Sequence, residues 1–117
     1  MPDEKIILVV EDDLNLLELY RVLFEANNYK VLSAPTGEKA VEIYSKTDNI
    51  GVVILDMVLP GISGEDVLNE IQQKNINQNV IMCTGYQLEN TFTGNVKLLS
   101  KPFLTPALLE LVKECFQ

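Results

Sequence analysis

Histidine is absent from this sequence. Its absence excludes general acid–base catalysis by an imidazole within the chain, and it excludes nucleophile pairs in which a histidine activates a serine or a cysteine. Zinc sites that use histidine ligands are excluded for the same reason. Any imidazole that the chemistry of this chain requires must come from another protein or domain.

Positive charge and cysteine are scarce. Nine lysines and arginines stand against 17 aspartates and glutamates, which gives a net charge of −8. Because phosphate contacts need clustered positive charge, we expect no direct binding of nucleic acid by this chain. The cysteines, Cys83 and Cys115, do not suggest a disulfide framework. Both stand at apolar positions, where small core residues are expected rather than reactive thiols.

The sequence also lacks long apolar runs. None approaches the ~20 residues that a helix needs to cross a bilayer. The charged start of the chain, residues 1–5, lacks the apolar core of a signal peptide. We therefore expect a cytoplasmic protein without membrane insertion. Its 117 residues, 47% of them hydrophobic, are consistent with one domain spanning 1–117.

Short apolar runs alternate with stretches of helical periodicity from end to end. Strand-like runs cover about residues 6–10, 30–34, 51–55, 79–84 and 96–100. Helix-like stretches extend from Leu14 to Asn28, from Thr36 to Lys46, from Ser63 to Lys74 and from Thr105 onward. This alternation predicts a parallel sheet with helices on both faces. In such sheets, ligands bind beyond the carboxyl ends of the strands, near the switch in strand order.

Acidic residues follow the first and the third of these runs. Glu11 and Asp12 come directly after the first, and Asp56 directly after the third. Carboxylates about 4 Å apart repel by roughly 4 kcal/mol at an effective dielectric near 20, so a cluster raises its own pKa values or recruits a cation. Oxygen ligands around a small pocket favour Mg²⁺. An acidic pair before a helix is more often a cap, the role predicted for Asp13, but no strong helix begins directly after Asp56.

A hydroxyl and a lysine follow the fourth and fifth runs. Thr84 can donate a hydrogen bond to a phosphoryl oxygen. Lys101 precedes Pro102, which restricts its backbone, and its ammonium can neutralise a phosphoryl group. Taken alone, Thr84 is better explained as a β-branched strand residue, and Lys101 as a solvated loop lysine. Together with the acids, in order at one sheet edge, they indicate a cation and phosphoryl site.

The ordered set of motifs resembles the receiver domain of two-component response regulators. The resemblance covers essentially the whole chain, and its segments are 9–13, 55–61 with Gly64, Thr84-Gly85 and 101–103. It is similar in form to the receivers of hybrid sensor histidine kinases. The fold that this resemblance implies is an α/β, flavodoxin-like, doubly wound sheet of five parallel strands in the order 2-1-3-4-5.

The resemblance also implies an Mg²⁺ site and a phosphoacceptor. Asp12 and Asp56 would bind Mg²⁺ together with the backbone carbonyl of Val58, and Glu11 would act through a coordinated water. Asp56 would accept a phosphoryl group from a phosphohistidine of a histidine kinase or a histidine phosphotransfer domain. Such a domain is not a conventional enzyme, although it assists its own phosphorylation and dephosphorylation.

Thr84 and Lys101 would bind the phosphoryl oxygens, and the loop after the fourth strand would respond to the new charge. Val58 and Tyr86 lie two positions after Asp56 and Thr84, beside the path of an attacking water. Neither activates water well, which predicts slow self-dephosphorylation with Tyr86 as a shield.

The chain departs from the usual family pattern at three places. Leu98 stands where family members usually carry Tyr or Phe, three residues before the lysine, and Glu11 replaces the commoner aspartate. The third departure is the polar segment from Gly85 to Gly94, between the fourth and fifth strands. It predicts that the family's fourth helix, which would lie there, is short or irregular.

Other functions were weighed against the same residues. A haloacid-dehalogenase-like phosphatase carries Asp-x-Asp, whereas Val58 occupies the second position here. A mononucleotide-binding domain needs a phosphate loop after the first strand, where the acids of 11–13 would repel phosphate. The alternative to a phosphoacceptor is a pseudo-receiver, a protein-interaction module that works without phosphorylation. In either case the chain is a stand-alone regulator or part of a larger chain.

Overall fold

The computed structural model describes residues 4–85, 91–101 and 105–117. These residues contain a five-stranded sheet in the order β2-β1-β3-β4-β5, with every neighbouring pair parallel. The strands are β1 (Ile6–Val10), β2 (Lys30–Ala34), β3 (Ile50–Asp56), β4 (Asn79–Thr84) and β5 (Val96–Ser100). The predicted doubly wound sheet and its strand order are confirmed.

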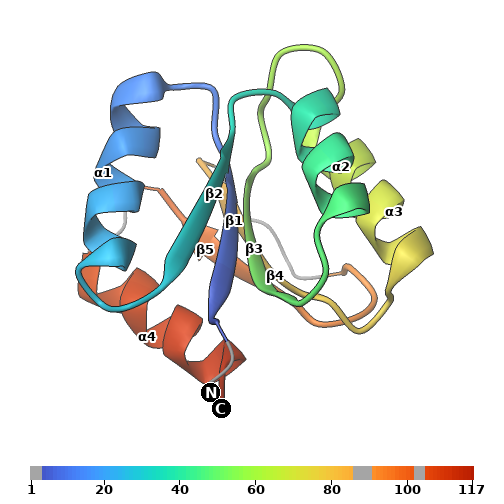
Figure 1. Ribbon diagram of the computed structural model, residues 1–117. Helices are drawn as coiled ribbons and strands as arrows, with labels where there is room; N and C mark the ends of the chain where they lie inside the picture. The colour runs from blue at the N-terminus through green and yellow to red at the C-terminus, as the bar shows by residue number, and fades with distance from the viewer. Residues whose placement is uncertain (1–3, 86–90, 102–104) are drawn as a thin grey trace.

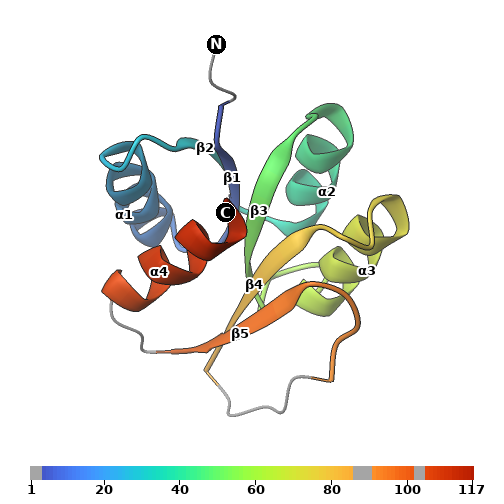
Figure 2. The same cartoon turned by 90° about the horizontal axis from the view of Figure 1, so that it is seen from below.

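Helices cover both faces of this sheet. The described residues contain α1 (Leu14–Glu25), α2 (Gly37–Lys46), α3 (Gly64–Lys74) and α4 (Thr105–Cys115). Figure 1 shows α1 and α4 on one face and α2 and α3 on the other. The same three layers are visible from below in Figure 2. None of the described helices combines the length and the apolar content that crossing a membrane requires.

Local side-chain chemistry sets where the helices begin. Asp13 accepts hydrogen bonds from the backbone N–H groups of Asn15 and Leu16 at the start of α1. Thr36 caps α2, and Ser63 forms a capping box with Asp66 at the start of α3. These side chains satisfy N–H groups that have no partner within the helix. The cap predicted at Asp13 is confirmed.

Helix α1 ends earlier than its apolar periodicity predicts. The predicted stretch continues to Asn28, whereas α1 ends at Glu25. Asn28 has a left-handed backbone with φ of 69°. The N–H of Tyr29 donates to the carbonyl of Phe24 at 3.0 Å, which turns the chain towards β2. Asparagine tolerates this conformation better than most residues and therefore often follows a helix end.

The core lies on both faces of the three central strands. Towards α1 and α4 it contains Ile7, Val9, Phe24, Ile54 and Leu108, and towards α2 and α3 it contains Leu8, Val10, Val53, Leu55, Val67 and Ile71. Because successive strand residues point to opposite faces, one apolar run supplies both clusters. Cys83 is buried and Cys115, half-buried, packs against the same cluster, so the predicted core positions of the cysteines are confirmed.

No helix is present in the described residues between β4 and β5, which are Gly85 and 91–95. The rest of the predicted fourth helix falls on 86–90, outside the described residues. Residues 91–95 are held against the end of α3. The Gln72 side-chain amide donates to the carbonyl of Thr93 at 2.7 Å, and the Asn95 amide donates to the carbonyl of Asn77 at 2.9 Å.

Candidate functional site

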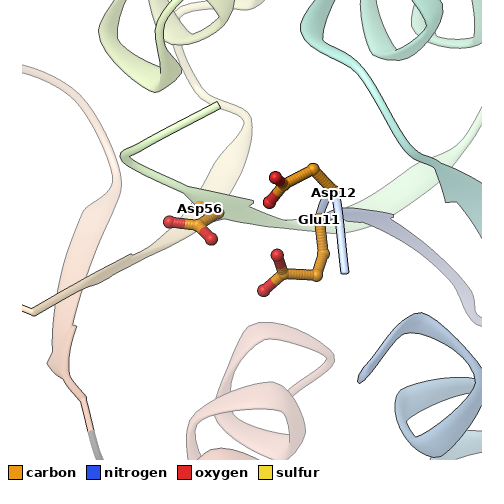
Figure 3. A group of neighbouring side chains, drawn as sticks. All are labelled: Glu11, Asp12 and Asp56. Atoms are coloured by element: carbon orange, nitrogen blue, oxygen red, sulfur yellow. The ribbon is translucent and has the colours of Figure 1, made fainter. Parts of the chain in front are cut away.

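Three carboxylates meet where the neighbouring strands β1 and β3 end. Glu11 and Asp12 directly follow β1, and Asp56 is the last residue of β3. Val10 pairs with Leu55 in the sheet, which brings the two strand ends level. One oxygen of each of the three acids lies within 4.8 Å of the others. Figure 3 shows the three side chains gathered at this edge of the sheet. Glu11 and Asp56 are buried, whereas Asp12 is exposed.

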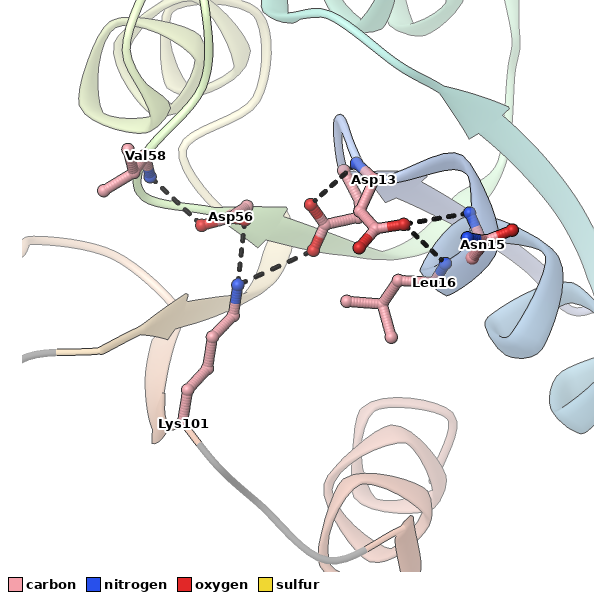
Figure 4. Close-up of polar contacts among 7 residues, drawn as sticks. Asp13, Asn15, Leu16, Asp56, Val58 and Lys101 are labelled. Atoms are coloured by element: carbon pink, nitrogen blue, oxygen red, sulfur yellow. Dashed lines mark hydrogen bonds and ion pairs between the residues drawn. The ribbon is translucent and has the colours of Figure 1, made fainter.

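A lysine from the other end of the chain completes this cluster. The ammonium of Lys101 donates to Oδ2 of Asp56 at 2.9 Å and lies 3.6 Å from Oε1 of Glu11. The other oxygen of Asp56, Oδ1, accepts from the backbone N–H of Val58 at 3.1 Å (Figure 4). These two donors fix the orientation of the Asp56 carboxylate.

The electrostatics of the cluster set Glu11 apart. Burial raises the pKa of Glu11 from 4.5 to about 7, and repulsion from Asp56 adds to the rise. A hydrogen bond from the backbone of Asp13 and the charge of Lys101 oppose it. For Lys101, burial lowers the pKa, but the hydrogen bond and the attraction to Asp56 outweigh burial and raise it above the usual value. The site thus holds one firmly charged ammonium and an acid that changes charge near neutral pH.

The backbone places Lys101 and Thr84 side by side. The N–H of Lys101 donates to the carbonyl of Thr84 at 2.7 Å, where β4 and β5 end together. Thr84 is buried and does not belong to the described residues that line the cleft over Asp56. The predicted site edge therefore includes both residues, but the cleft exposes Lys101 and not Thr84.

The cleft has a volume of about 650 Å³ and is lined by Glu11, Asp12, Asp13, Leu16, Asp56, Val58, Gly85 and Lys101. Leu16, in the first turn of α1, packs against the core on the α1 and α4 side. It is only half-buried and reaches the cleft, because the first turn of α1 begins beside the acids. The signal was available in the spacing, since Leu16 follows the capping residue by less than one helical turn.

The donor set fits a hard divalent cation. The clustered side chains offer carboxylate oxygens only, with neither thiolate nor imidazole among them. Such ligands favour Mg²⁺ over softer metals. Two of the carboxylates are buried beside each other, an arrangement whose repulsion a cation relieves.

The remaining residues singled out in the sequence do not line the cleft or lie outside the described residues. Leu98, in the position expected to carry an aromatic ring, lies in β5 and packs half-buried against the core on the α2 and α3 side. Tyr86, Pro102 and Phe103 lie outside the described residues, so the shielding role of Tyr86 stays a prediction.

Comparison with known proteins adds to this geometry. Residues 7–113 match the response regulator receiver domain family. A cyclic di-GMP phosphodiesterase of Thermotoga maritima is 33% identical over 108 residues, which cover 92% of this chain but only 28% of that protein. This chain therefore spans little more than a quarter of the length of that relative.

Two solved receivers match this chain over almost their whole length. The receiver domain of the hybrid histidine kinase CckA has a TM-score of 0.83 and 32% identity, covering 96% of this chain and 99% of that one. The response regulator TrrA of Thermotoga maritima, solved with Mg(2+)-BeF, has a TM-score of 0.83 and 32% identity, covering 95% and 98%. TrrA in complex with the histidine kinase ThkA has a TM-score of 0.84 and 32% identity, covering 97% and 99%.

Proposed function

This chain belongs to the response regulator receiver domain family of two-component signalling, and we propose that it is a phosphoacceptor switch in which Asp56 is the residue phosphorylated. The observation that carries the proposal is the setting of that carboxylate. Asp56 is buried and lines the cleft of about 650 Å³. The Lys101 ammonium lies 2.9 Å from its carboxylate, and two further acids lie beside it. We take residues 1–117 as the receiver domain, which the family match over 7–113 supports.

The reaction is the transfer of a phosphoryl group from nitrogen to oxygen. An oxygen of Asp56 forms a bond to phosphorus while the bond between phosphorus and the donor's imidazole nitrogen breaks. The imidazole leaves with the electron pair, and Asp56 becomes an acyl phosphate. Because these 117 residues contain no histidine, the imidazole belongs to another protein or domain. Positioning and charge neutralisation carry most of the catalysis in such transfers.

The residues that would hold Mg²⁺ are Asp12, Asp56 and the backbone carbonyl of Val58, with Glu11 acting through a water. When bound, the ion neutralises the charge that develops on the phosphoryl oxygens. Glu11 and Asp56 contribute by being fixed beside each other before the partner arrives, since both are buried. Asp12, which is exposed, completes the set from the side of the cleft.

Lys101 and Thr84 would bind the phosphoryl oxygens. The lysine already contacts Asp56 and needs only a small shift to reach them. Thr84 is buried, so its hydroxyl must be drawn towards the cleft. Its carbonyl accepts from the N–H of Lys101, so a displacement of one residue is transmitted to the other and to the loop that begins at Gly85. This link supports a switch in which the loop after β4 responds to phosphorylation.

The phosphodonor would be a histidine kinase or a histidine phosphotransfer domain. The solved complex of TrrA with ThkA supports a kinase as partner. Whatever protein delivers the group must cover the mouth of the cleft, where the side chain of Val58 is 63% exposed. Such an apolar rim residue is suited to contact with a protein partner.

Incubation with a small-molecule phosphodonor tests this function. We expect intact mass spectrometry to detect one added phosphoryl group that requires Mg²⁺, and we expect Asp56→Asn to remove it. Asp13→Asn is the matched control, because it makes the same change in the same cleft while the asparagine retains the helix cap.

A phosphoryl group that persists in Asp56→Asn, or that forms equally without Mg²⁺, would contradict the proposal. A folded wild-type protein that gains no phosphoryl group from either a small donor or a phosphorylated histidine phosphotransfer domain would favour the pseudo-receiver alternative.

A further inference from the structure

The loop that joins β3 to α3, residues 57–63, is held from outside by a residue of a different helix. Glu38, in the first turn of α2, accepts a hydrogen bond from the backbone N–H of Ile62 at 3.1 Å. The two residues are 24 positions apart in the sequence. The carboxylate therefore acts as a strut between the start of α2 and the far limb of this loop.

The surrounding backbone is shaped to admit this strut. Gly61 has a φ of +77°, and a Cβ atom there would lie 2.7 Å from one carboxylate oxygen of Glu38 and 2.8 Å from the other. A side chain at Gly61 would be strained by its backbone and would displace the carboxylate. At the start of α2, a Cβ on Gly37 would lie 2.5 Å from Cγ1 of Ile62. Two glycines thus allow the helix and the loop to approach closely.

The same loop is closed at its other end against the phosphoacceptor. The N–H of Gly64 donates to the carbonyl of Met57 at 3.1 Å, and a Cβ on Gly64 would collide with the backbone carbonyl of Asp56. Within the loop, the N–H of Val58 donates to Oδ1 of Asp56 at 3.1 Å. A displacement of the far limb would therefore reach the backbone of Val58 and the carboxylate of Asp56 through a short, closed ring of chain.

From these contacts we propose that Glu38 is a positioning residue for the Mg²⁺ and phosphoacceptor site, acting through the loop 57–63. The inference rests on the proposed function of Asp56 and adds a residue that lies outside the cleft. Glu38 touches neither the acids nor the lysine. It holds the far limb of the loop, and the loop holds the carbonyl of Val58 and orients Asp56. Groups that orient metal ligands from outside commonly change metal affinity when they are removed.

The strut depends on the reach of the side chain and on an acceptor oxygen, not on charge. Glu38→Gln keeps the length and an oxygen acceptor but removes the charge. Glu38→Asp keeps the charge but shortens the arm by one methylene, and Glu38→Ala removes both. Glu42→Ala is the matched control, because Glu42 lies one turn further along α2 and pairs only with Lys39 and Lys46 among the contacts that the described residues make.

Two measurements separate positioning from helix stability. The first is amide hydrogen exchange at Ile62 in the metal-free protein. Loss of one hydrogen bond is worth about 1 kcal/mol, so we expect Glu38→Ala and Glu38→Asp to speed exchange by roughly 5-fold. The second is the Mg²⁺ dissociation constant from an NMR titration at a temperature where every variant is folded. We expect it to rise by up to roughly 10-fold in Glu38→Ala and Glu38→Asp, and to stay near the wild-type value in Glu38→Gln and Glu42→Ala.

Several other outcomes would overturn the inference. Faster exchange at Ile62 with unchanged Mg²⁺ affinity means that the strut does not position the site. Equal loss of affinity in Glu38→Gln and Glu38→Asp means that charge, and not reach, is what matters. Should Glu38→Ala fail to fold, the Gln and Asp variants still decide between the two. A wild-type protein that binds Mg²⁺ but gains no phosphoryl group would refute the proposed function while leaving the strut to be judged by affinity. Wild-type protein without Mg²⁺ binding would overturn both.

Discussion

The two sides of the sheet support the site in different ways. On the α2 and α3 side, Gly37 lies against Ile62, the carboxylate of Glu38 spans to the same residue, and Lys74 contacts Ser45 across the two helices. On the α1 and α4 side, a cleft of about 480 Å³ opens between the helices and is lined by Leu16, Leu19, Tyr20, Leu23, Lys101, Thr105 and Leu108.

Residues of the site are supported from both sides of the sheet. The loop that carries Val58 and follows Asp56 is tied to the closely packed side. Lys101 lies at the margin of the open cleft, where Leu19 of α1 is 59% exposed. Close packing beside the site resists displacement, whereas a cleft leaves room for side chains to move. The far ends of α2 and α3 are themselves separated by a pocket of about 370 Å³ that Ser45 and Lys74 help to line. Asp56 and Lys101 therefore rest on different supports, although the Lys101 ammonium lies 2.9 Å from Oδ2 of Asp56.

The largest effect would come from the buried face of α1, and it would show what holds the open side together. Phe24 is fully buried and stacks on Tyr20, with ring centroids 6.2 Å apart. We expect Phe24→Ala to lower the free energy of unfolding by about 3–5 kcal/mol, measured by urea denaturation. Leu19→Ala, on the exposed face of the same helix, should change it by less than about 0.5 kcal/mol. A large loss from Leu19→Ala would mean that the open cleft contributes to stability.

A second test acts on the closely packed side. A Cβ on Gly37 would lie 2.5 Å from Ile62 and 2.7 Å from Cγ2 of Val67, which is fully buried. Gly37→Ala should therefore destabilise the protein by about 1–3 kcal/mol through overpacking. Gly85→Ala is the control, because among the described residues, its chain neighbours apart, no atom lies within 4 Å of a Cβ there. Equal effects of the two substitutions in thermal unfolding would show that the interface of α2 and α3 yields easily.

The dependence of stability on pH probes the acids that lie between the two sides. Burial raises the pKa of Glu11 from 4.5 to about 7, so the folded protein binds this proton more tightly than the unfolded chain. Stability should then fall as pH rises from about 4.5 to about 7, by on the order of 2 kcal/mol without Mg²⁺. With no histidine in the sequence, few other groups change charge in this range.

Glu11→Gln should abolish most of that fall when urea denaturation is compared at several pH values. Glu18→Gln, on the exposed surface of α1, should retain it. A decline of the same size in both variants would assign the pH dependence to other groups.

The smallest expected loss of stability comes from removing the N-caps of the helices on the two sides. Asp13→Ala removes the acceptor for two N–H groups of α1 and should cost about 1 kcal/mol, while Asp13→Asn should cost only a few tenths. Ser63→Ala breaks the capping box of α3 and should cost a similar amount. Similar losses in thermal unfolding would show that the two sides differ in packing and not in their helix starts, whereas a marked inequality would place part of the difference in the caps.

Several parts of the fold followed from local patterns in the sequence. The five strands were predicted from short apolar runs, and the observed strands differ from them only at the ends of β3, which includes Asp56 itself. The cap at Asp13 was predicted because capping involves residues within one turn of each other. The end of α1 was predicted too late, since the left-handed backbone of Asn28 leaves no mark in the apolar periodicity.

Some features of the site also followed from the sequence, and others did not. Residues at the carboxyl ends of parallel strands share one edge of the sheet, so the proximity of Glu11, Asp12 and Asp56 followed from sequence order alone. The burial of Thr84 did not follow, because it depends on how its neighbours pack.

Alternating apolar periods and capping residues determined the layers of this protein and the edge of the sheet on which its acids stand. Only the folded chain decided that Lys101 contacts Asp56 across 45 positions and that Glu38 spans 24 positions to the loop of the site. The reason is physical. Periodicity and caps express interactions within one turn or one strand, whereas these two contacts depend on the packing of whole elements against each other.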